Sequence, residues 1–145
     1  MLGVSTCPLY SDFNRNDWTQ LSDSALLEPK LKWEQQCIEA PAVCVHNDSF
    51  FMFYGGAYNN SPQQIGCATS QDGICWQRLS NEPFLGNGKP GSWNSCESGH
   101  PFVFNDDDGK TYLFYQGNND MGKTWWISYV EIKWENGIPN IVKNG

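Results

Sequence analysis

The sequence predicts an all-β protein with a β-propeller-like architecture of about two and a half four-stranded antiparallel blades. A sequence unit repeats along the chain, and each copy contains short apolar runs separated by turn residues. The chain is rich in aromatic residues (14%), and its 14 glycines and 8 prolines suit strands and turns more than helices. Pro29 interrupts the best helical candidate, which lies between residues 22 and 36.

The repeat is marked by three tryptophans. Trp18, Trp76 and Trp134 follow one another at intervals of 58 residues, and residues 18–27 align with 76–85. Because these tryptophans recur with the repeat, we expect them to pack as wedges between blades. Further landmarks match in the same order, namely Trp33 and Trp93, Pro41 and Pro101, and the aromatic runs 50–56 and 111–117.

Each complete copy is expected to form four short strands. In the first copy they should lie near 42–47, 50–56, 64–70 and 75–80, and in the second near 101–105, 111–117, 124–131 and 133–142. Asn, Asp and Gly stand between these runs, and they accept the backbone conformations that tight turns require. His46 falls in the first of these turns, where we expect it to be solvated.

The strand pattern indicates a single propeller-like domain over residues 1–145. It divides into an outer half-blade (7–27) and two blades (38–85 and 96–142). Two and a half blades do not close a ring, so the open faces need a cover. A partner chain, an open sandwich-like packing or additional sequence would each provide one. We favour self-association into a homodimer, because two chains would supply about five blades.

Composition excludes several other functions. The net charge is −7 and no run of Lys or Arg exists, so we expect no nucleic-acid partner and no membrane partner. Residues 1–10 lack the features of a secretory signal, which predicts a cytoplasmic protein unless a signal has been removed. The six cysteines match no zinc pattern, and in this setting we expect free thiols.

Several motifs resemble one group of enzymes. Ile38-Glu-Ala-Pro-Ala-Val43, Phe51-Met-Phe-Tyr-Gly-Gly56 and the run from Ile65 to Trp76 resemble a blade of the five-bladed propeller glycosidases. These are the arabinanases, xylosidases, invertases and levansucrases, including glycoside hydrolase families 43 and 32. Residues 98–104 and 108–115 look like a later blade of the same enzymes. The resemblance covers about residues 5–140 and implies a protein that cleaves or binds carbohydrate.

The resemblance also implies a site on the propeller axis. Such enzymes use three carboxylates there, and Glu39 matches the glutamate that acts as general acid. The two aspartates have no counterpart, because their inner strands would precede Met1. His100 resembles a histidine that often helps to hold a central cation, and the resemblance leaves open a cation near His100. No other cofactor and no set of protein metal ligands is predicted.

Each candidate site residue also has a structural interpretation. Glu39 is either the general acid or a polar cap at a strand entry. His100 either contacts substrate or forms hydrogen bonds within a turn. Glu97 is either a second carboxylate at the axis mouth or a surface glutamate in a loop. Trp33 and Trp93 either stack on sugar rings or pack between blades.

Three functions therefore compete. The first is a glycosidase with Glu39 as its general acid. The second is a carbohydrate-binding module without catalysis, which would use the same axis pocket. The third is a structural or interaction protein that retains the blades alone. The expected lack of aspartates favours the second and third, whereas the motifs around Glu39 and His100 favour the first.

Overall fold

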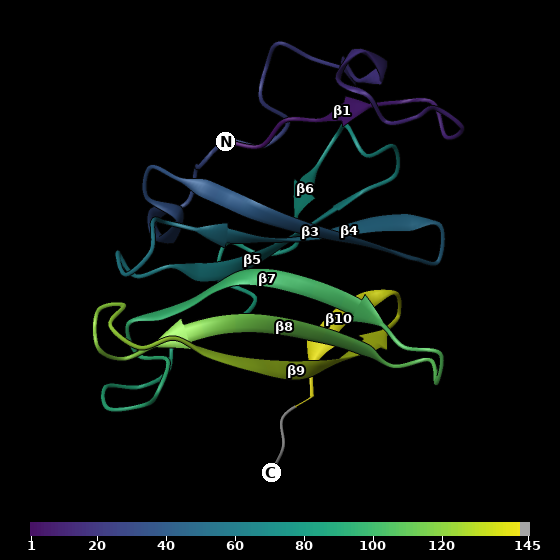
Figure 1. Cartoon of the computed structure of the whole chain (residues 1–145). Helices are drawn as coiled ribbons and strands as arrows, with labels where there is room; N and C mark the ends of the chain where they lie inside the picture. Colours follow the sequence, from purple (N-terminus) through teal and green to yellow (C-terminus); the bar gives the residue numbers. More distant parts are fainter. Residues whose placement is uncertain (143–145) are drawn as a thin grey trace.

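The protein consists of three antiparallel β-sheets stacked in the order of the sequence (Figure 1). Its computed structural model describes residues 1–142. The first sheet has only two strands, β1 (Ser5–Thr6) and β2 (Thr19–Gln20). Two short 3-10 turns, η1 (Arg15–Asp17) and η2 (Lys32–Glu34), lie in the connections. The prediction of an all-β protein built from antiparallel four-stranded blades is confirmed.

The second sheet, named blade 1 here, has the strand order β3-β4-β5-β6. Its strands are β3 (Ile38–His46), β4 (Ser49–Gly56), β5 (Gln64–Ser70) and β6 (Gln77–Arg78). The two middle strands agree with the predicted ranges to within one residue. The inner strand β3 begins earlier than predicted, because its pairing with β4 continues beyond a β-bulge to Ile38.

The third sheet, named blade 2, has the same order of strands. They are β7 (Glu97–Asn105), β8 (Thr111–Asn118), β9 (Trp126–Glu135) and β10 (Ile138–Ile141). The predicted break between residues 131 and 133 is wrong, because β9 continues to Glu135. The chain turns instead at Asn136 and Gly137, which have φ values of 53° and 76°. Asn-Gly is well suited to this turn because both residues tolerate positive φ.

The third tryptophan of the repeat is therefore not equivalent to the first two. Trp18 and Trp76 each stand directly before a fourth strand, whereas Trp134 lies within a third strand. Trp134 stacks on His46 of blade 1, with ring centroids 3.9 Å apart. The expectation of a solvated His46 is thus wrong. The expectation that Trp18 packs between blades is also wrong, because its side chain is 48% exposed.

The two-stranded first sheet corresponds to the outer half of a blade. Leu2 forms an isolated bridge with Leu27, in the same way that Ile65 of β5 forms one with Leu85. Strands β1 and β2 also pair antiparallel, as β5 and β6 do in blade 1. We therefore call this sheet the half-blade.

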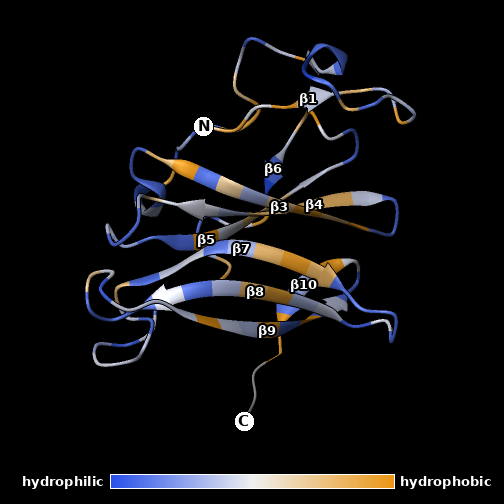
Figure 2. Ribbon diagram, viewed as in Figure 1, coloured by the Kyte–Doolittle hydropathy of each residue, from blue (hydrophilic) through white to orange (hydrophobic). Residues whose placement is uncertain are grey.

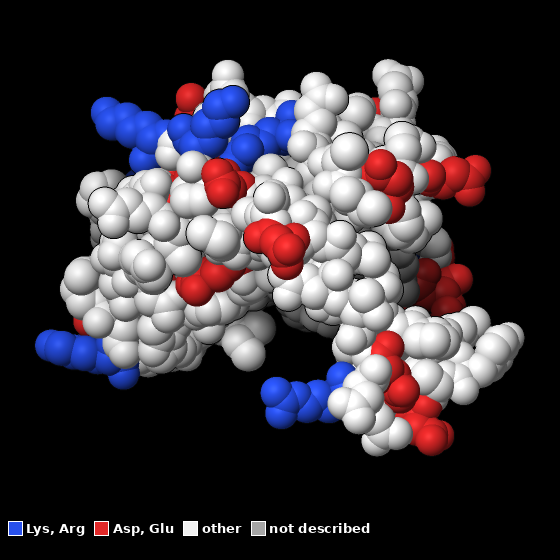
Figure 3. Space-filling model, turned by 90° about the horizontal axis from the view of Figure 1, so that it is seen from above, with Lys and Arg blue, Asp and Glu red and all other residues white. Residues whose placement is uncertain are grey.

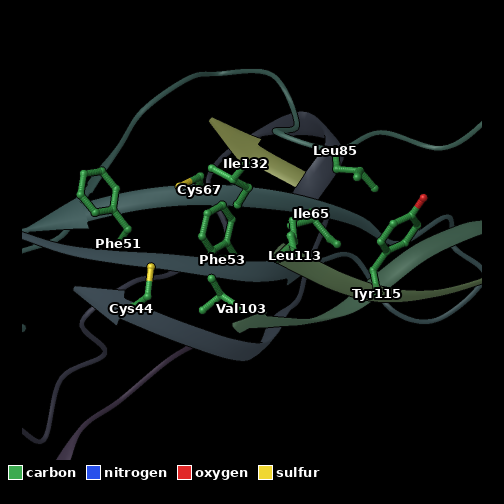
Figure 4. Packing of buried hydrophobic residues seen from close by; sticks show 10 residues of the cluster. All are labelled: Cys44, Phe51, Phe53, Ile65, Cys67, Leu85, Val103, Leu113, Tyr115 and Ile132. Atoms are coloured by element: carbon green, nitrogen blue, oxygen red, sulfur yellow. The ribbon is translucent and has the colours of Figure 1, made fainter. Parts of the chain in front are cut away.

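Alternation along β4 gives blade 1 two buried faces. Phe51 and Phe53 point toward blade 2, whereas Met52 and Tyr54 point toward the half-blade. Figure 2 shows the hydrophobic stretches along β4, β7 and β8. The larger core lies between the two blades, where Phe53 packs with residues such as Val103 and Leu113 of blade 2 (Figure 4).

A buried ion pair fastens the loop before β3 to the rest of blade 1. The fully buried carboxylate of Glu34 accepts hydrogen bonds from Arg78 at 2.7 and 2.9 Å, and from the Tyr54 hydroxyl at 2.7 Å. The backbone N–H groups of Lys30 and Leu31 also donate to it. Burial alone would raise the pKa of Glu34, but these hydrogen bonds lower it below its ordinary value.

All six cysteines are free thiols, and burial raises the pKa of Cys44 to about 11. Within residues 1–142, no helix is long and apolar enough to cross a bilayer.

Replacing Glu34 with Gln should destabilise the protein by about 3–5 kcal/mol, because Arg78 would lose its charged partner inside the fold. Urea unfolding measures this loss, and exposed Glu82→Gln serves as the matched control. Since the pKa of Glu34 is lower in the folded state, its contribution is complete above its unfolded pKa. The gap between wild type and Glu34→Gln should therefore narrow as the pH falls below about 4. A gap that stays constant down to acid pH would contradict the ionic role.

Candidate functional site

Glu39 and His100 lie on matching β-bulges at the starts of the two inner strands. The register of β3 against β4 shifts between Glu39 and Ala42, and that of β7 against β8 shifts between Gly99 and Phe102. Bulges bend a strand and redirect its side chains, and they are frequent near active sites. The repeat thus builds the same backbone irregularity twice.

The two bulges also share an unusual backbone conformation. Ala40 and His100 both have positive φ values, 49° and 45°, and each is followed by a proline. A positive φ is uncommon for residues other than glycine and costs backbone energy. Ala40 and His100 thus occupy equivalent places in the repeat. Glu39 is the residue before this place in blade 1, whereas His100 occupies the place itself in blade 2.

Gln63 joins the two bulges across the interface between the blades. Its Nε2 donates to Glu39 Oε1 at 2.8 Å and to the Ala57 carbonyl at 2.9 Å. Its Oε1 accepts the backbone N–H of His100 at 3.2 Å. The side chain is fully buried, so these partners replace water completely. Gln63 therefore fixes one oxygen of Glu39 relative to His100.

Two glycines make room for the Gln63 amide. A Cβ on Gly99 would lie 1.9 Å from Gln63 Oε1, and one on Gly55 would lie 3.0 Å from its Cδ. Gly99 belongs to β7 and Gly55 to β4, so the amide lies between the two blades. Any side chain at Gly99 would displace Gln63 from this position.

Glu97 is buried beneath the histidine. Its Oε2 accepts the backbone N–H of Asn60 at 2.8 Å, and its Oε1 accepts Gln116 Nε2 at 2.9 Å. The alternative of a surface glutamate in a loop is wrong, because Glu97 opens β7 and its side chain is 0% exposed. Backbone pairing with Asn118 and the covering 57–63 loop explain this burial.

His100 stands between the two carboxylates. Its Nε2 lies 3.9 Å from Glu39 Oε1, and its Nδ1 lies 3.9 Å from Glu97 Oε1. Gln116 Nε2 contacts Nδ1 directly. The ring is 38% exposed and Glu39 is 37% exposed, so both reach solvent from one edge of the interface. At 3.9 Å the imidazole and Glu39 do not form a hydrogen bond, but they interact electrostatically when the ring is protonated.

Trp33 occupies the other face of blade 1. Its ring stacks on Tyr54 at 6.1 Å and lies directly over Gly56, while its Nε1 donates to the Asn81 carbonyl. Alternation along β4 places Gly56 and Gly55 on opposite faces, so Trp33 is separated from Gln63 by the sheet. The structure thus does not bring Trp33 together with Glu39.

Trp93 repeats this packing on blade 2, with an open side. It packs over Gly117 and lies 5.7 Å from the Tyr115 ring. It also lines a shallow pocket of about 350 Å³ with Trp126, Ile127 and Ser128. Trp93 therefore combines a structural contact with an accessible aromatic surface.

The side chains at this site do not by themselves form a metal-binding cluster. Among the described residues, no group of three or more His, Cys, Asp or Glu side chains is arranged to hold a metal ion. His100 Nδ1 contacts Gln116, and Glu97 has both oxygens engaged. The chemistry available here is that of one accessible carboxyl group beside an imidazole.

Sequence reasoning missed Gln63 and Gln116. Gln116 could have been found, because it departs from the glycine at the aligned position, Gly55. Gln63 lies in the loop before β5 and its partners are distant in sequence, so no local pattern marks it.

The strand order of the two four-stranded antiparallel sheets is that of β-propeller blades. The family model of glycosyl hydrolases family 43 matches residues 8–139, and the chain belongs to this family. The resemblance stated from the sequence motifs is thereby confirmed.

Solved structures and a curated protein show the same relationship. A thermostable family-43 glycoside hydrolase has a TM-score of 0.69 and 24% identity, over 80% of this chain and 40% of its own. The α-L-arabinofuranosidase from Lactobacillus brevis has a TM-score of 0.68 and 18% identity, over 95% of this chain and 46% of its own. The β-1,2-mannobiose phosphorylase of Thermoanaerobacter sp. (strain X514) is 24% identical over 137 residues, or 84% of this chain and 43% of the phosphorylase. The chain thus spans less than half the length of these relatives.

Gln63→Ala should lower the free energy of unfolding by about 1–3 kcal/mol, because buried groups of both blades would lose their partner. Thermal and urea unfolding measure this change. Gln77→Ala is the matched control, since Gln77 is exposed on β6. Equal stability of the two variants would show that Gln63 does not join the blades.

Proposed function

We propose that this protein acts on glycosides at the inner-strand bulges, with Glu39 as the general acid. The observation that carries the proposal is the environment of Glu39. One carboxyl oxygen is held by Gln63 at 2.8 Å, and the side chain is accessible from the edge where His100 also emerges. A positioned and accessible carboxyl group is what proton donation to a leaving oxygen requires.

In this proposal each residue of the site has a separate role. Protonated Glu39 gives its proton to the glycosidic oxygen while the bond from that oxygen to the anomeric carbon breaks. His100 contacts the sugar or the leaving group from the opposite blade. Glu97 and Gln116 orient the imidazole from beneath. Trp93 offers a ring face for a sugar, whereas Trp33 is occupied by packing.

The relatives suggest which substrates to test. Their names include an α-L-arabinofuranosidase, a xylan β-1,4-xylosidase from Bacillus halodurans C-125 and a β-1,2-mannobiose phosphorylase. In the first two the acceptor of the sugar would be water, and in the third it would be phosphate. We therefore propose a glycoside as substrate and leave the acceptor to the assay.

A second function is favoured by the state of Glu97. Glycosidic cleavage normally uses two carboxyl groups about 5–10 Å apart across the scissile bond. Both oxygens of Glu97 are engaged and its side chain is fully buried, so it does not reach a substrate. The alternative is a protein that binds carbohydrate at this edge without cleaving it, or one that serves as a structural or interaction partner.

The enzyme proposal predicts that wild type cleaves a glycoside and that Glu39→Gln does so at least about 100-fold more slowly, as expected for loss of a general acid. The substrates are aryl arabinosides, xylosides and fructosides, together with β-1,2-mannobiose in the presence of inorganic phosphate. Exposed Glu82→Gln is the matched control and should retain wild-type rates.

Turnover in neither wild type nor Glu39→Gln would reject the enzyme proposal. A glycan array would then separate the remaining functions. Binding that weakens in His100→Ala supports a carbohydrate-binding protein, whereas no binding supports a structural or interaction role. Unchanged turnover in Glu39→Gln would show that another residue supplies the proton.

A further inference from the structure

His100 is held at both its backbone and its ring. Its backbone N–H donates to Gln63 Oε1 at 3.2 Å, and its ring nitrogen Nδ1 contacts Gln116 Nε2. Gln63 also donates to Glu39. Gln116 also donates to Glu97, so each of the two glutamines links the histidine to one carboxyl group.

Part of this polar cluster is shielded from water. Glu97 and Gln63 are fully buried, whereas the charged side chains at the half-blade end of the molecule lie on its surface (Figure 3). Inside a protein, a contact in which two donors face one another costs free energy, because water does not supply the missing acceptor. The directions of the hydrogen bonds around His100 therefore follow from which of its neighbours are able to donate.

Glu97 determines which end of the Gln116 amide faces the histidine. An ionised carboxylate accepts hydrogen bonds and donates none. Glu97 Oε2 accepts the backbone N–H of Asn60 at 2.8 Å, and its Oε1 faces the Gln116 amide at 2.9 Å. The nitrogen of that amide, rather than its oxygen, must therefore lie beside Glu97. The same nitrogen contacts His100 Nδ1.

The direction of this contact determines where the imidazole carries its proton. The Gln116 amide nitrogen has two hydrogens and accepts no hydrogen bond, so one hydrogen points to Glu97 and the other to His100. The second contact is favourable only when Nδ1 keeps its lone pair. In a neutral imidazole one nitrogen accepts and the other carries the hydrogen, which is then Nε2. Nε2 is the nitrogen that lies 3.9 Å from Glu39 Oε1.

Comparison of the two blades indicates that these three polar residues act as a unit. In the register of the repeat, the positions of Glu97, His100 and Gln116 in blade 2 are occupied in blade 1 by Cys37, Ala40 and Gly55. The blade 1 residues have no carboxyl group, no imidazole and no side-chain amide at these places. The three polar groups are thus present together in one copy and absent together from the other.

We propose that Gln116 is a positioning residue that fixes His100 in the tautomer with its hydrogen on Nε2. Glu97 sets the orientation of the amide, and the amide in turn sets the tautomer of the ring. The site thereby presents an N–H donor beside the accessible carboxyl group of Glu39. Such a donor suits an oxygen atom of a bound sugar, and this last step rests on the proposed function.

Nuclear magnetic resonance measures the tautomer directly and without a substrate. The protein contains two histidines, so comparison with His46→Gln assigns the ring signals of His100. Long-range proton–nitrogen correlation spectra are recorded at about pH 8, where free imidazole is neutral. Wild type should show a hydrogen on Nε2 and a lone pair on Nδ1. A His100 ring that carries a hydrogen on Nδ1, alone or together with Nε2, overturns the proposal.

Two variants test the two steps separately, and circular dichroism verifies that they fold. Gln116→Met keeps a side chain of similar size without a donor, so the hydrogen should move to Nδ1, which lies 3.9 Å from Glu97 Oε1. Glu97→Gln no longer requires a donor from Gln116, and a mixture of both tautomers is expected. Gln77→Met is the matched control on β6 and should leave the His100 signals unchanged. A single Nε2–H tautomer that persists in either folded variant of the site overturns the proposal.

Turnover tests the step that rests on glycoside cleavage. On any aryl glycoside that wild type cleaves, Gln116→Met should be about tenfold slower, as expected for loss of one hydrogen bond to the substrate. Gln77→Met should retain the wild-type rate. Equal rates in Gln116→Met and wild type would show that the Nε2 donor does not serve the reaction. Lack of turnover in wild type would reject the glycosidase function, while the measured tautomer would still decide the role of Gln116.

Discussion

The packing of blade 1 on blade 2 is the contact on which the rest of the structure depends. Phe53 of β4 is fully buried, and its partners Val103 and Leu113 come from β7 and β8. This apolar core holds the two blades, and with them the inner strands β3 and β7, against one another. It therefore also sets how close Glu39 of β3 and His100 of β7 come, and the candidate site belongs to neither blade alone.

Gln63 is the polar counterpart of that contact. Hydrophobic packing fixes how far apart two sheets lie but is tolerant of small sliding motions, whereas hydrogen bonds specify position along the strands. The buried amide of Gln63 binds groups of both blades at 2.8–3.2 Å. Gln63 thereby fixes the accessible carboxyl group of Glu39 relative to the backbone of His100 on the neighbouring sheet.

The sequence was informative where local pattern decides structure. The aromatic runs placed β4 and β5 to within one residue, and the repeat put Glu39 and His100 at equivalent strand entries. The sequence was not informative where a contact between residues distant in the chain, or a single turn, determines the structure. Asn136 and Gly137 moved the last turn and changed the role of Trp134, although the tryptophan spacing was regular. The burial of Glu97 depends on Asn60 of the other blade, which no local window contains.

The two bulges also show how a duplicated unit becomes asymmetric. In the register of the repeat, Gly99 of blade 2 stands where blade 1 has Glu39. The missing side chain at Gly99 is the space that Gln63 fills to hold Glu39. The carboxylate of Glu39 in one copy and the absent side chain of Gly99 in the other are thus both needed to accommodate Gln63. The copies are no longer interchangeable, and a consensus sequence averaged over the repeat would erase the site while preserving the fold.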